Sequence, residues 1–341
     1  MFIKYNEYMK NKVKNSPFNI VLLTICSFVG VGFITGVEIW FYFARFGLNM
    51  IFGVIYFTVL TFLLVYFALG ESDAQNDRFI QFKRQISAVS ELLIASAMIS
   101  GLAEQSRLIF GNGWLIVFLI SISIVFCLLW LGLKSFIFYN YFVAIFIVFV
   151  VIVLFRFNNN FLLDFEPKFS LNLSLKSIVF AGVYIFMNIA EIKPILSEFS
   201  EKQNEKKKVL TALFVTGSLV FLMITLSFVL QNNRNISQNS MPFLLLFNNF
   251  GGVVEWVFLV GLIMTLISTA VACLIGVKNK LILKNNDEKF CKIIVIISAL
   301  ILGQIPFLVF IKIIYPIIAI FSFILFIFEF IFKRGKKMIC K

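Results

Sequence analysis

Long apolar runs without a single charged residue most constrain how this chain can fold. The segments 46–70, 111–133, 135–155 and 209–233 contain no Asp, Glu, Lys or Arg. A helix that crosses about 30 Å of hydrocarbon needs about 20 apolar residues, so each run is long enough. None of them alternates between apolar and polar residues as a strand of a membrane barrel would. The sequence therefore predicts an all-α membrane protein, in agreement with 61% apolar residues and a mean hydropathy of +0.99.

The apolar runs, divided at charged and turn-forming residues, predict about ten transmembrane helices in one domain that covers 1–341. The first run is too long for the core of a signal peptide, and another apolar run follows it at once, so we expect it to be retained. The expected spans are 18–46, 48–69, 86–110, 113–133, 137–155, 175–198, 209–230, 251–277, 293–311 and 313–332.

Basic residues indicate how these helices are oriented. With a cytoplasmic amino terminus, 22 of the 30 lysines and arginines fall on the cytoplasmic side, 7 fall on the opposite side, and Lys193 lies inside a span. Cytoplasmic loops of membrane proteins carry such an excess. We therefore expect a multi-pass protein with both termini in the cytoplasm. The net charge of +13 is then explained by the orientation of the helices in the lipid bilayer and does not indicate binding of nucleic acid.

Three glycines interrupt the first expected helix near the middle of the membrane. Gly30, Gly32 and Gly36 lie within seven residues, and each weakens a helix by up to about 1 kcal/mol relative to alanine. Gly32 and Gly36 also form a GxxxG pair, which close packing against another helix would explain as well. The pattern indicates either a packing contact or a break in the helix.

The sixth expected helix has its own interruption, where Asn188, Glu191 and Pro194 follow an apolar run. An early helix end would also explain these residues. However, the first and sixth spans begin two halves of five helices, about 18–155 and about 175–332, which have opposite orientations in the membrane. Matching interruptions in inverted repeats point to a solute site at the membrane midplane. Unpaired amides there favour a carboxylate, and unpaired carbonyls favour a cation.

Two motifs in the first span are similar to those of a known family. Residues 30–38 (GVGFITGVE) and 43–47 (FARFG) resemble the GAGFASGQE and FFxRFG motifs of YkvI-type bacterial membrane proteins. Shorter likenesses occur at 184–188 (YIFMN), 268–271 (STAV) and 315–316 (YP). That family resembles the amino-acid permeases of the APC superfamily. The resemblance implies the LeuT fold, discontinuous helices 1 and 6, and a location in the bacterial cytoplasmic (inner) membrane.

The resemblance also implies a site for a coupling ion. In LeuT-fold transporters a sodium ion bridges carbonyl groups of the first helix and hydroxyl groups of the eighth. Oxygen ligands of this kind suit a hard cation, although serine and threonine hydroxyls also bond back to their own helix. The corresponding positions here are Cys26, Val29, Thr265, Ser268 and Thr269.

Carboxylates inside the spans can bind and release a proton, which makes a proton the alternative coupling ion. An unpaired charge at the membrane centre costs at least about 2.5 kcal/mol, so such residues are paired, protonated or close to water. The acidic residues in or near spans are Glu38, Glu91, Glu104, Glu191 and Glu255. Among these we expect Glu191 to be functional, because it follows the interruption of the sixth helix, and Glu91 and Glu255 to lie near water.

Together these features predict a symporter that moves a small amino-acid-like or organic solute by alternating access, with sodium or a proton as the coupling ion and no other cofactor. The glycines would expose backbone groups to the solute's carboxylate, and the polar side chains would contact its other groups. The expected solute-binding residues are Gly30, Gly32, Thr35, Gly36, Asn188 and Glu191.

Two other classes of function are alternatives to transport. A receptor subunit that senses a small ligand in the same pocket would have the same sequence features. An intramembrane enzyme would need a nucleophile with a base, or a set of metal ligands. The chain has no histidine, and its cysteines are scattered singly, so we expect no enzyme. The five cysteines are Cys26, Cys127, Cys273, Cys291 and Cys340.

Overall fold

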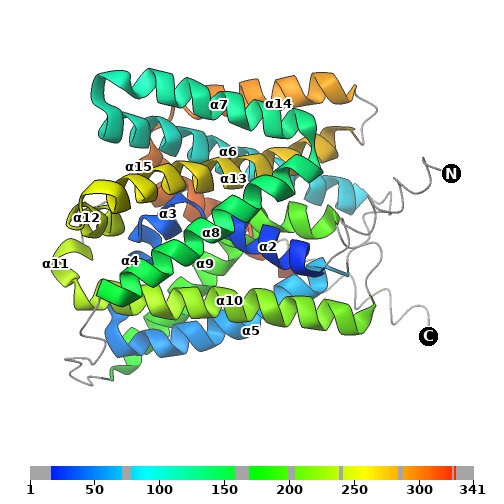
Figure 1. Cartoon of the computed structure of the whole chain (residues 1–341). Coiled ribbons are helices and arrows are strands. Elements are labelled where there is room, and N and C mark those ends of the chain that lie inside the picture. Colours follow the sequence, from blue (N-terminus) through cyan, green and yellow to red (C-terminus); the bar gives the residue numbers. More distant parts are fainter. Residues whose placement is uncertain are drawn as a thin grey trace, which may run out of the picture.

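The structure, a computed structural model, describes residues 17–70, 78–157, 169–198, 204–237, 241–282, 287–324 and 326–327. All regular structure within these residues is helical (Figure 1). The basic residues of 1–16 and 328–341, which contribute to the expected orientation, lie outside the described residues. The elements are α2 (Pro17–Phe28), α3 (Val31–Ile34), α4 (Val37–Tyr42), η1 (Ala44–Asn49), α5 (Met50–Ala68), α6 (Arg78–Phe110), η2 (Gly111–Gly113), α7 (Trp114–Leu131), α8 (Leu133–Phe157), α9 (Leu171–Glu198), α10 (Glu205–Asn232), α11 (Arg234–Ser237), α12 (Pro242–Asn248), α13 (Gly252–Ile282), α14 (Glu288–Leu302), α15 (Phe307–Val309) and η4 (Phe310–Ile314), followed by helical residues 315–324.

Most of these helices are long and apolar enough to cross a membrane. Seven helical stretches of the described residues meet both conditions, and the shorter apolar helix α2 precedes them. Three of the seven join consecutive helices. Val37–Ala68 contains α4, η1 and α5, Arg84–Leu131 contains most of α6 together with η2 and α7, and Phe307–Ile324 contains α15, η4 and the helical residues 315–324. The expectation of an all-helical, multi-pass membrane protein is confirmed. Each of the first eight expected spans corresponds to a helix or to a broken series of helices.

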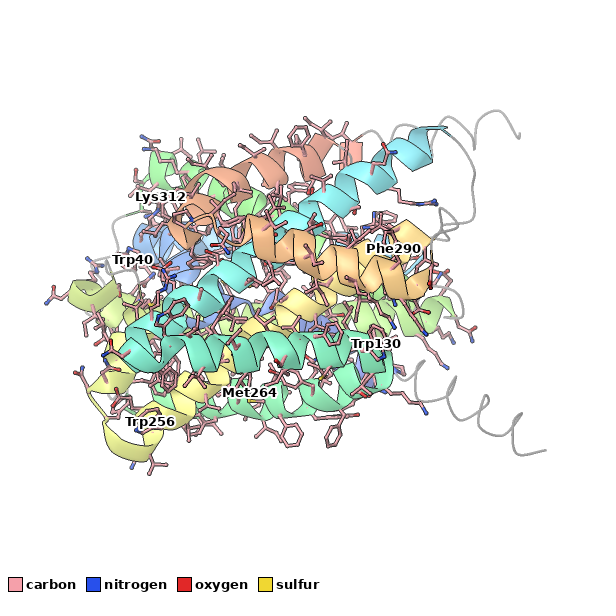
Figure 2. All side chains as sticks on the ribbon, turned by 90° about the horizontal axis from the view of Figure 1, so that it is seen from above. Trp40, Trp130, Trp256, Met264, Phe290 and Lys312 are labelled. Atoms are coloured by element: carbon pink, nitrogen blue, oxygen red, sulfur yellow. The ribbon has the colours of Figure 1, made fainter. Side chains whose placement is uncertain are left out.

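The outer surface of the bundle is apolar, as contact with lipid requires. Ile55 on α5, Ile116 on α7 and Ile145 on α8 are 57%, 65% and 67% exposed. So many exposed apolar side chains would drive aggregation in water, whereas lipid chains are their natural surroundings. Figure 2 shows Trp256 towards one end of the molecule and Trp130 towards the other. Tryptophan gathers at the two interfaces of a membrane in this way.

Long helices pair to build the bundle around α13. Helix α6 packs along α13, and α5 packs along α9 and α10. Figure 1 shows α5 and α10 side by side on one side of the molecule, with α7 and α14 on the opposite side. Every residue of α13 from Thr265 to Val277 is buried. The hydroxyl groups of this helix therefore face protein and not lipid.

The boundary between the ninth and tenth helices was predicted wrongly. Helix α14 ends at Leu302 and α15 begins after Pro306, whereas the two expected spans divide near Lys312. Pro306 cannot continue α14, because it lacks an N–H donor and its ring blocks the preceding turn. Lys312 instead lies within a π-helical turn that precedes Pro316. Pro316 offers no N–H to that turn, which explains the local widening and places Tyr315-Pro316 inside the last helix.

Several helices extend beyond their apolar runs. Helix α6 begins at Arg78 and not near 86, α10 begins at Glu205, and α13 continues to Ile282. Hydropathy marks the part of a helix that lies in lipid, whereas the backbone hydrogen bonds continue into the polar residues on either side. The short helices α11 and α12 lie between α10 and α13 and pack against them.

Candidate functional site

The first helix is broken twice, as the glycine pattern indicates. Helix α2 ends at Phe28, and the N–H of Gly30 donates to the Phe28 carbonyl at 2.9 Å, which is too tight a turn for a helix. A single turn, α3, follows. The chain breaks again at Gly36, whose φ of 84° lies in the left-handed region, before α4 begins. The expected discontinuity of helix 1 is confirmed.

Helix α12 covers the second break. The N–H of Phe243 donates to the Thr35 carbonyl at 2.9 Å, so a group that the break leaves unpaired finds a partner. A Cβ added at Gly36 would lie 2.9 Å from the Phe243 ring, closer than real Cβ contacts come. The hydroxyl of Thr35 donates to the Gly32 carbonyl at 3.3 Å. Gly36 is therefore needed both for its backbone conformation and for the close approach of α12.

The sixth helix is continuous, which corrects the expected break. Helix α9 runs unbroken from Leu171 to Glu198 and passes through Pro194. The buried amide of Asn188 donates to the Tyr184 carbonyl of the same helix at 2.8 Å, so this polar residue supports the helix and does not interrupt it. Transmembrane helices tolerate proline because neighbouring groups satisfy the freed backbone. The side chain of Glu191 lies outside the described residues.

The five expected ion-site residues meet where α2 crosses α13. All five are 0% exposed. The Thr269 hydroxyl lies 3.3 Å from the Ser27 carbonyl of α2 and 3.2 Å from the Thr265 carbonyl, and it can donate to either. The Thr265 hydroxyl donates to the Leu262 carbonyl at 2.8 Å. These two hydroxyls thus bond to carbonyl groups of their own helix, α13, but the Thr269 hydroxyl also reaches α2.

Asn140 on α8 joins this cluster and is not among the five residues expected from the sequence. The Ser268 hydroxyl donates to Asn140 Oδ1 at 2.6 Å, and the Asn140 backbone carbonyl accepts from the Cys26 thiol at 3.5 Å. Asn140 Nδ2 donates to the Phe136 carbonyl, which fixes the orientation of the amide. The sequence feature that points to Asn140 is that it is the one asparagine in the charge-free run 135–155. The three helices together present a set of buried oxygen atoms of the kind that hard cations prefer.

Glu38 is the carboxylate that the structure places at the break. Its side chain is 5% exposed and folds back over Gly32, where an added Cβ would overlap the carboxylate. The Tyr184 hydroxyl of α9 interacts with the Glu38 carboxyl group. Glu38 thus connects α4 to the helix that faces the break. It ends the GVGFITGVE motif, but the sequence could not show that its side chain turns back towards Gly32.

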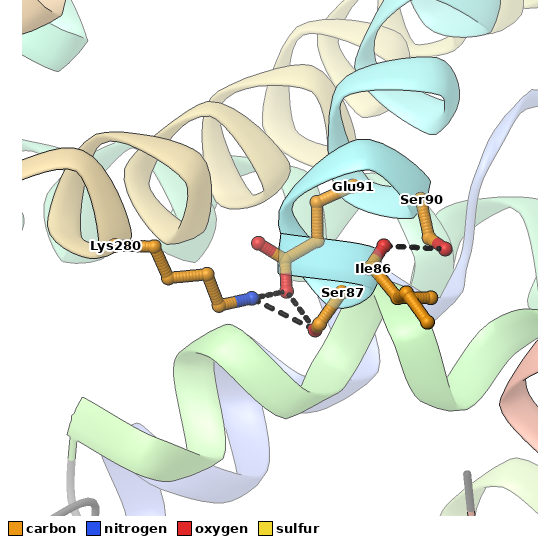
Figure 3. Close-up of polar contacts among 5 residues, drawn as sticks. All are labelled: Ile86, Ser87, Ser90, Glu91 and Lys280. Atoms are coloured by element: carbon orange, nitrogen blue, oxygen red, sulfur yellow. Dashed lines mark hydrogen bonds and ion pairs between the residues drawn. The ribbon is translucent and has the colours of Figure 1, made fainter. Parts of the chain in front are cut away.

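Glu91 lies in the interior, which corrects the expectation that it sits near water. It is 0% exposed on α6 and forms an ion pair with Lys280 of α13 (Figure 3). The Ser87 hydroxyl donates to Glu91 Oε1 at 3.1 Å, and Lys280 Nζ donates to Ser87 Oγ at 2.8 Å. Lys193 of α9 is close enough to interact electrostatically with Glu91. Glu255, by contrast, is partly exposed in the first turn of α13.

Comparisons with known proteins identify the fold. No protein-family model matches the chain, and no curated protein matches it. Among solved structures it matches Mhp1, a nucleobase-cation-symport-1 family transporter, in a closed conformation with bromovinylhydantoin bound. The TM-score is 0.60 at 13% identity, over 92% of this chain and 75% of that one. The chain has the LeuT fold. In this structure the broken first helix packs against the buried part of α13, residues 265–277, in the interior of the bundle.

Proposed function

We propose that this chain is a secondary active transporter that carries a small amino-acid-like or organic solute across the bacterial cytoplasmic membrane by alternating access. The observation that carries the proposal is the broken first helix, which faces α9 and the buried hydroxyls of α13 in the interior of a LeuT-fold bundle. A break of this kind leaves backbone groups that a solute or an ion can satisfy. Mhp1, with the same fold, is a transporter and holds a small molecule.

The solute is proposed to lie at the break, between the first helix and α9. Thr35 and Asn188 would supply polar groups to the solute there. The residues proposed to contact the solute are Gly30, Gly32, Thr35, Gly36, Asn188 and Glu191.

Uptake by the purified protein in liposomes tests the proposal. Labelled amino acids, amines and small organic solutes are screened under an imposed sodium gradient and, separately, an imposed proton gradient. Gly32→Leu is the inactive control, because its side chain needs the space that the Glu38 carboxylate fills. We expect a solute to accumulate with wild type and not with Gly32→Leu. Absence of accumulation for every solute, together with ligand-induced thermal stabilisation of the same protein, would instead indicate a receptor.

Sodium is the coupling ion that the geometry of α2, α8 and α13 supports. The proposed ligand positions are Cys26, Val29, Thr265, Ser268 and Thr269. Thr269→Val removes the bridging hydroxyl and keeps the shape of the side chain. We expect sodium-driven uptake to need at least about tenfold more sodium, as the loss of roughly 1.4 kcal/mol of ion binding would produce.

The matched control is Thr225→Val on α10, where the buried hydroxyl donates to the Phe221 carbonyl of its own helix at 2.7 Å. This variant should keep the wild-type dependence on sodium. If Thr269→Val and Thr225→Val respond alike, or if only a proton gradient drives uptake, sodium coupling at this cluster is wrong.

A further inference from the structure

Aromatic side chains mark one end of the outer helix pair, α7 and α14. Figure 1 shows these two helices on one side of the molecule, and both pack against α6. Trp130 is 42% exposed one residue before the end of α7, and Phe290 is 58% exposed near the start of α14. Figure 2 shows both side chains towards the same end of the molecule. Exposed aromatic rings at the end of a transmembrane helix lie at the depth of the lipid headgroups.

Lysines from two other helices lie at this end of α7. Lys292 of α14 reaches across to α7, since its Nζ lies 5.2 Å from the centroid of the Trp130 ring. Lys289 is its neighbour on α14, because residues three apart on a helix share a face. Lys134 lies in the first turn of α8, directly after the turn at Gly132 that ends α7. Helices α8 and α14 thus both place lysines at the end of α7 that carries Trp130.

The two carboxylates at the start of α14 do not neutralise these lysines. Glu288 is shared, because its Oε1 lies 3.0 Å from Lys292 Nζ and 3.7 Å from Lys278 Nζ. Asp287 is used by the backbone, since its side chain accepts from the N–H of Lys289 at 3.1 Å and caps α14. One carboxylate thus serves two ammonium groups, and the other serves the end of a helix.

Lys134 and Lys289 are therefore left without a counter-charge. Both are exposed, and neither forms an ion pair with another described residue. A lysine side chain lies along apolar surface with its stem and keeps its ammonium group at the level of the headgroups. Each such lysine strengthens binding to an anionic lipid surface about fivefold. This end of α7 and α14 therefore favours a lipid headgroup with a net negative charge.

The opposite end of α7 has a similar pair of ring and cation but no such excess of charge. There the guanidinium group of Arg107 lies 4.2 Å from the centroid of the Trp114 ring. Glu104 lies three residues before Arg107 on α6, so a carboxylate accompanies the guanidinium group. The two ends of α7 thus differ in charge balance, whereas both present a tryptophan beside a cation.

We propose that an anionic phospholipid binds at the end of α7 that carries Trp130, with its phosphate group at Lys134 and Lys289. The phosphate supplies the negative charge that this cluster lacks. The acyl chains lie along exposed apolar side chains of the two helices, such as Ile124 of α7 and Ile293 of α14. A zwitterionic phospholipid brings its own cation and compensates the lysines less. This lipid site lies outside the bundle, so it goes beyond the proposed transport and does not depend on it.

Quenching of tryptophan fluorescence by brominated lipids tests the proposal, because bromine on an acyl chain quenches only a tryptophan close to it. Trp130 is made the single tryptophan of the full-length chain by Trp40→Phe, Trp114→Phe and Trp256→Phe. The protein is reconstituted in mixed phosphatidylglycerol and phosphatidylcholine, with bromine on one lipid and then on the other. We expect phosphatidylglycerol to bind beside Trp130 about fivefold more strongly or better. A chain that keeps Trp114 alone should show less than about twofold preference.

Double variants connect this preference to the lysines. Lys134→Gln/Lys289→Gln should reduce the preference at Trp130 to less than about twofold, and it leaves no carboxylate unpaired. The matched control, Lys206→Gln/Lys207→Gln, removes two exposed lysines from the start of α10 and should keep the preference. The inference is overturned if Trp130 shows no preference, if Trp114 shows the same preference, or if both double variants lose it equally.

Mass spectrometry of the intact wild-type protein keeps the test valid if the single-tryptophan chains do not fold. The protein in detergent receives equal amounts of the two phospholipids, and the lipids that stay bound are counted. We expect phosphatidylglycerol to be retained in excess by wild type and by Lys206→Gln/Lys207→Gln, but not by Lys134→Gln/Lys289→Gln. Equal retention of the two lipids by wild type, or the same excess in both double variants, would contradict the proposal. Solute uptake is measured separately, so the failure of either proposal leaves the other intact.

Discussion

Gly36 holds the second break of the first helix in a conformation that other residues rarely adopt. Its φ of 84° is left-handed, and the Phe243 ring closes on the position that a Cβ would take. A left-handed conformation costs a residue with a side chain roughly 1–2 kcal/mol before any steric conflict. The break is therefore built into the sequence at one residue.

We expect Gly36→Ala to lower the melting temperature of the purified protein and to reduce its stability by about 1–2 kcal/mol or more. The matched control is Gly217→Ala in α10, where nothing lies within 4 Å of the added Cβ. That variant should be as stable as wild type or more stable, because alanine favours a helix. Equal melting temperatures for the two variants would show that the Gly36 conformation is unstrained.

At the residue scale, the sequence could predict the break of the first helix, but it predicted a break of the sixth helix wrongly and could not predict the directions of side chains. Glycine spacing indicated the interruption of the first helix because backbone freedom depends on local sequence. Glu38, in contrast, reaches Gly32 and Tyr184 only after α4 and α9 have packed together. Asn188 appeared to interrupt its helix, but its amide found an acceptor one turn earlier. Such choices depend on tertiary contacts.

At the scale of elements, the ion pair between Glu91 and Lys280 connects α6 to α13 within the bundle. The Glu91 side chain is 0% exposed and that of Lys280 is 20% exposed. Removing one partner of a buried pair leaves the other charge without compensation, which is more costly than the pair itself is stabilising. The pair therefore makes the contact between these two helices sensitive to single substitutions.

We expect Lys280→Met to destabilise the purified protein by about 3 kcal/mol, measured by thermal or denaturant unfolding. Replacing Glu91 by glutamine in the same variant should restore part of that stability, because no unpaired charge remains. Lys292→Met is the control, since its partner Glu288 is 55% exposed and such a pair contributes little. A double variant no more stable than Lys280→Met would argue against an uncompensated charge as the cause.

Element boundaries were predictable only where the chain marks them by chemistry. Charge-free runs predicted the helices that cross the membrane, because few other structures satisfy the backbone hydrogen bonds in hydrocarbon. The division near Lys312 failed, because a charged residue does not end a helix, whereas Pro306 does. Helix α9 passes through Pro194 and needs no break at the membrane midplane. The repeats expected at 18–155 and 175–332 remain a prediction.

At the scale of the whole molecule, apolar patterning was enough to indicate the fold class. A chain that buries residues 265–277 of α13 and exposes isoleucine and leucine on the outside of the bundle has to lie in lipid. The LeuT fold brings residues from distant parts of the sequence together, such as Thr269 and Ser27. At 13% identity to Mhp1 the likeness shows the fold alone, so proposals about function have to be argued from the side chains of this chain.

Counterflow tests alternating access at a single site most directly. Liposomes that contain the protein are loaded with an excess of an unlabelled solute identified by the uptake screen, and a trace of the labelled solute is added outside, with no ion gradient. We predict that the labelled solute accumulates transiently above its equilibrium level with wild type and not with Gly32→Leu, because one site exchanges solute between the two sides. Labelled solute that only equilibrates, with no overshoot, would contradict an alternating-access carrier.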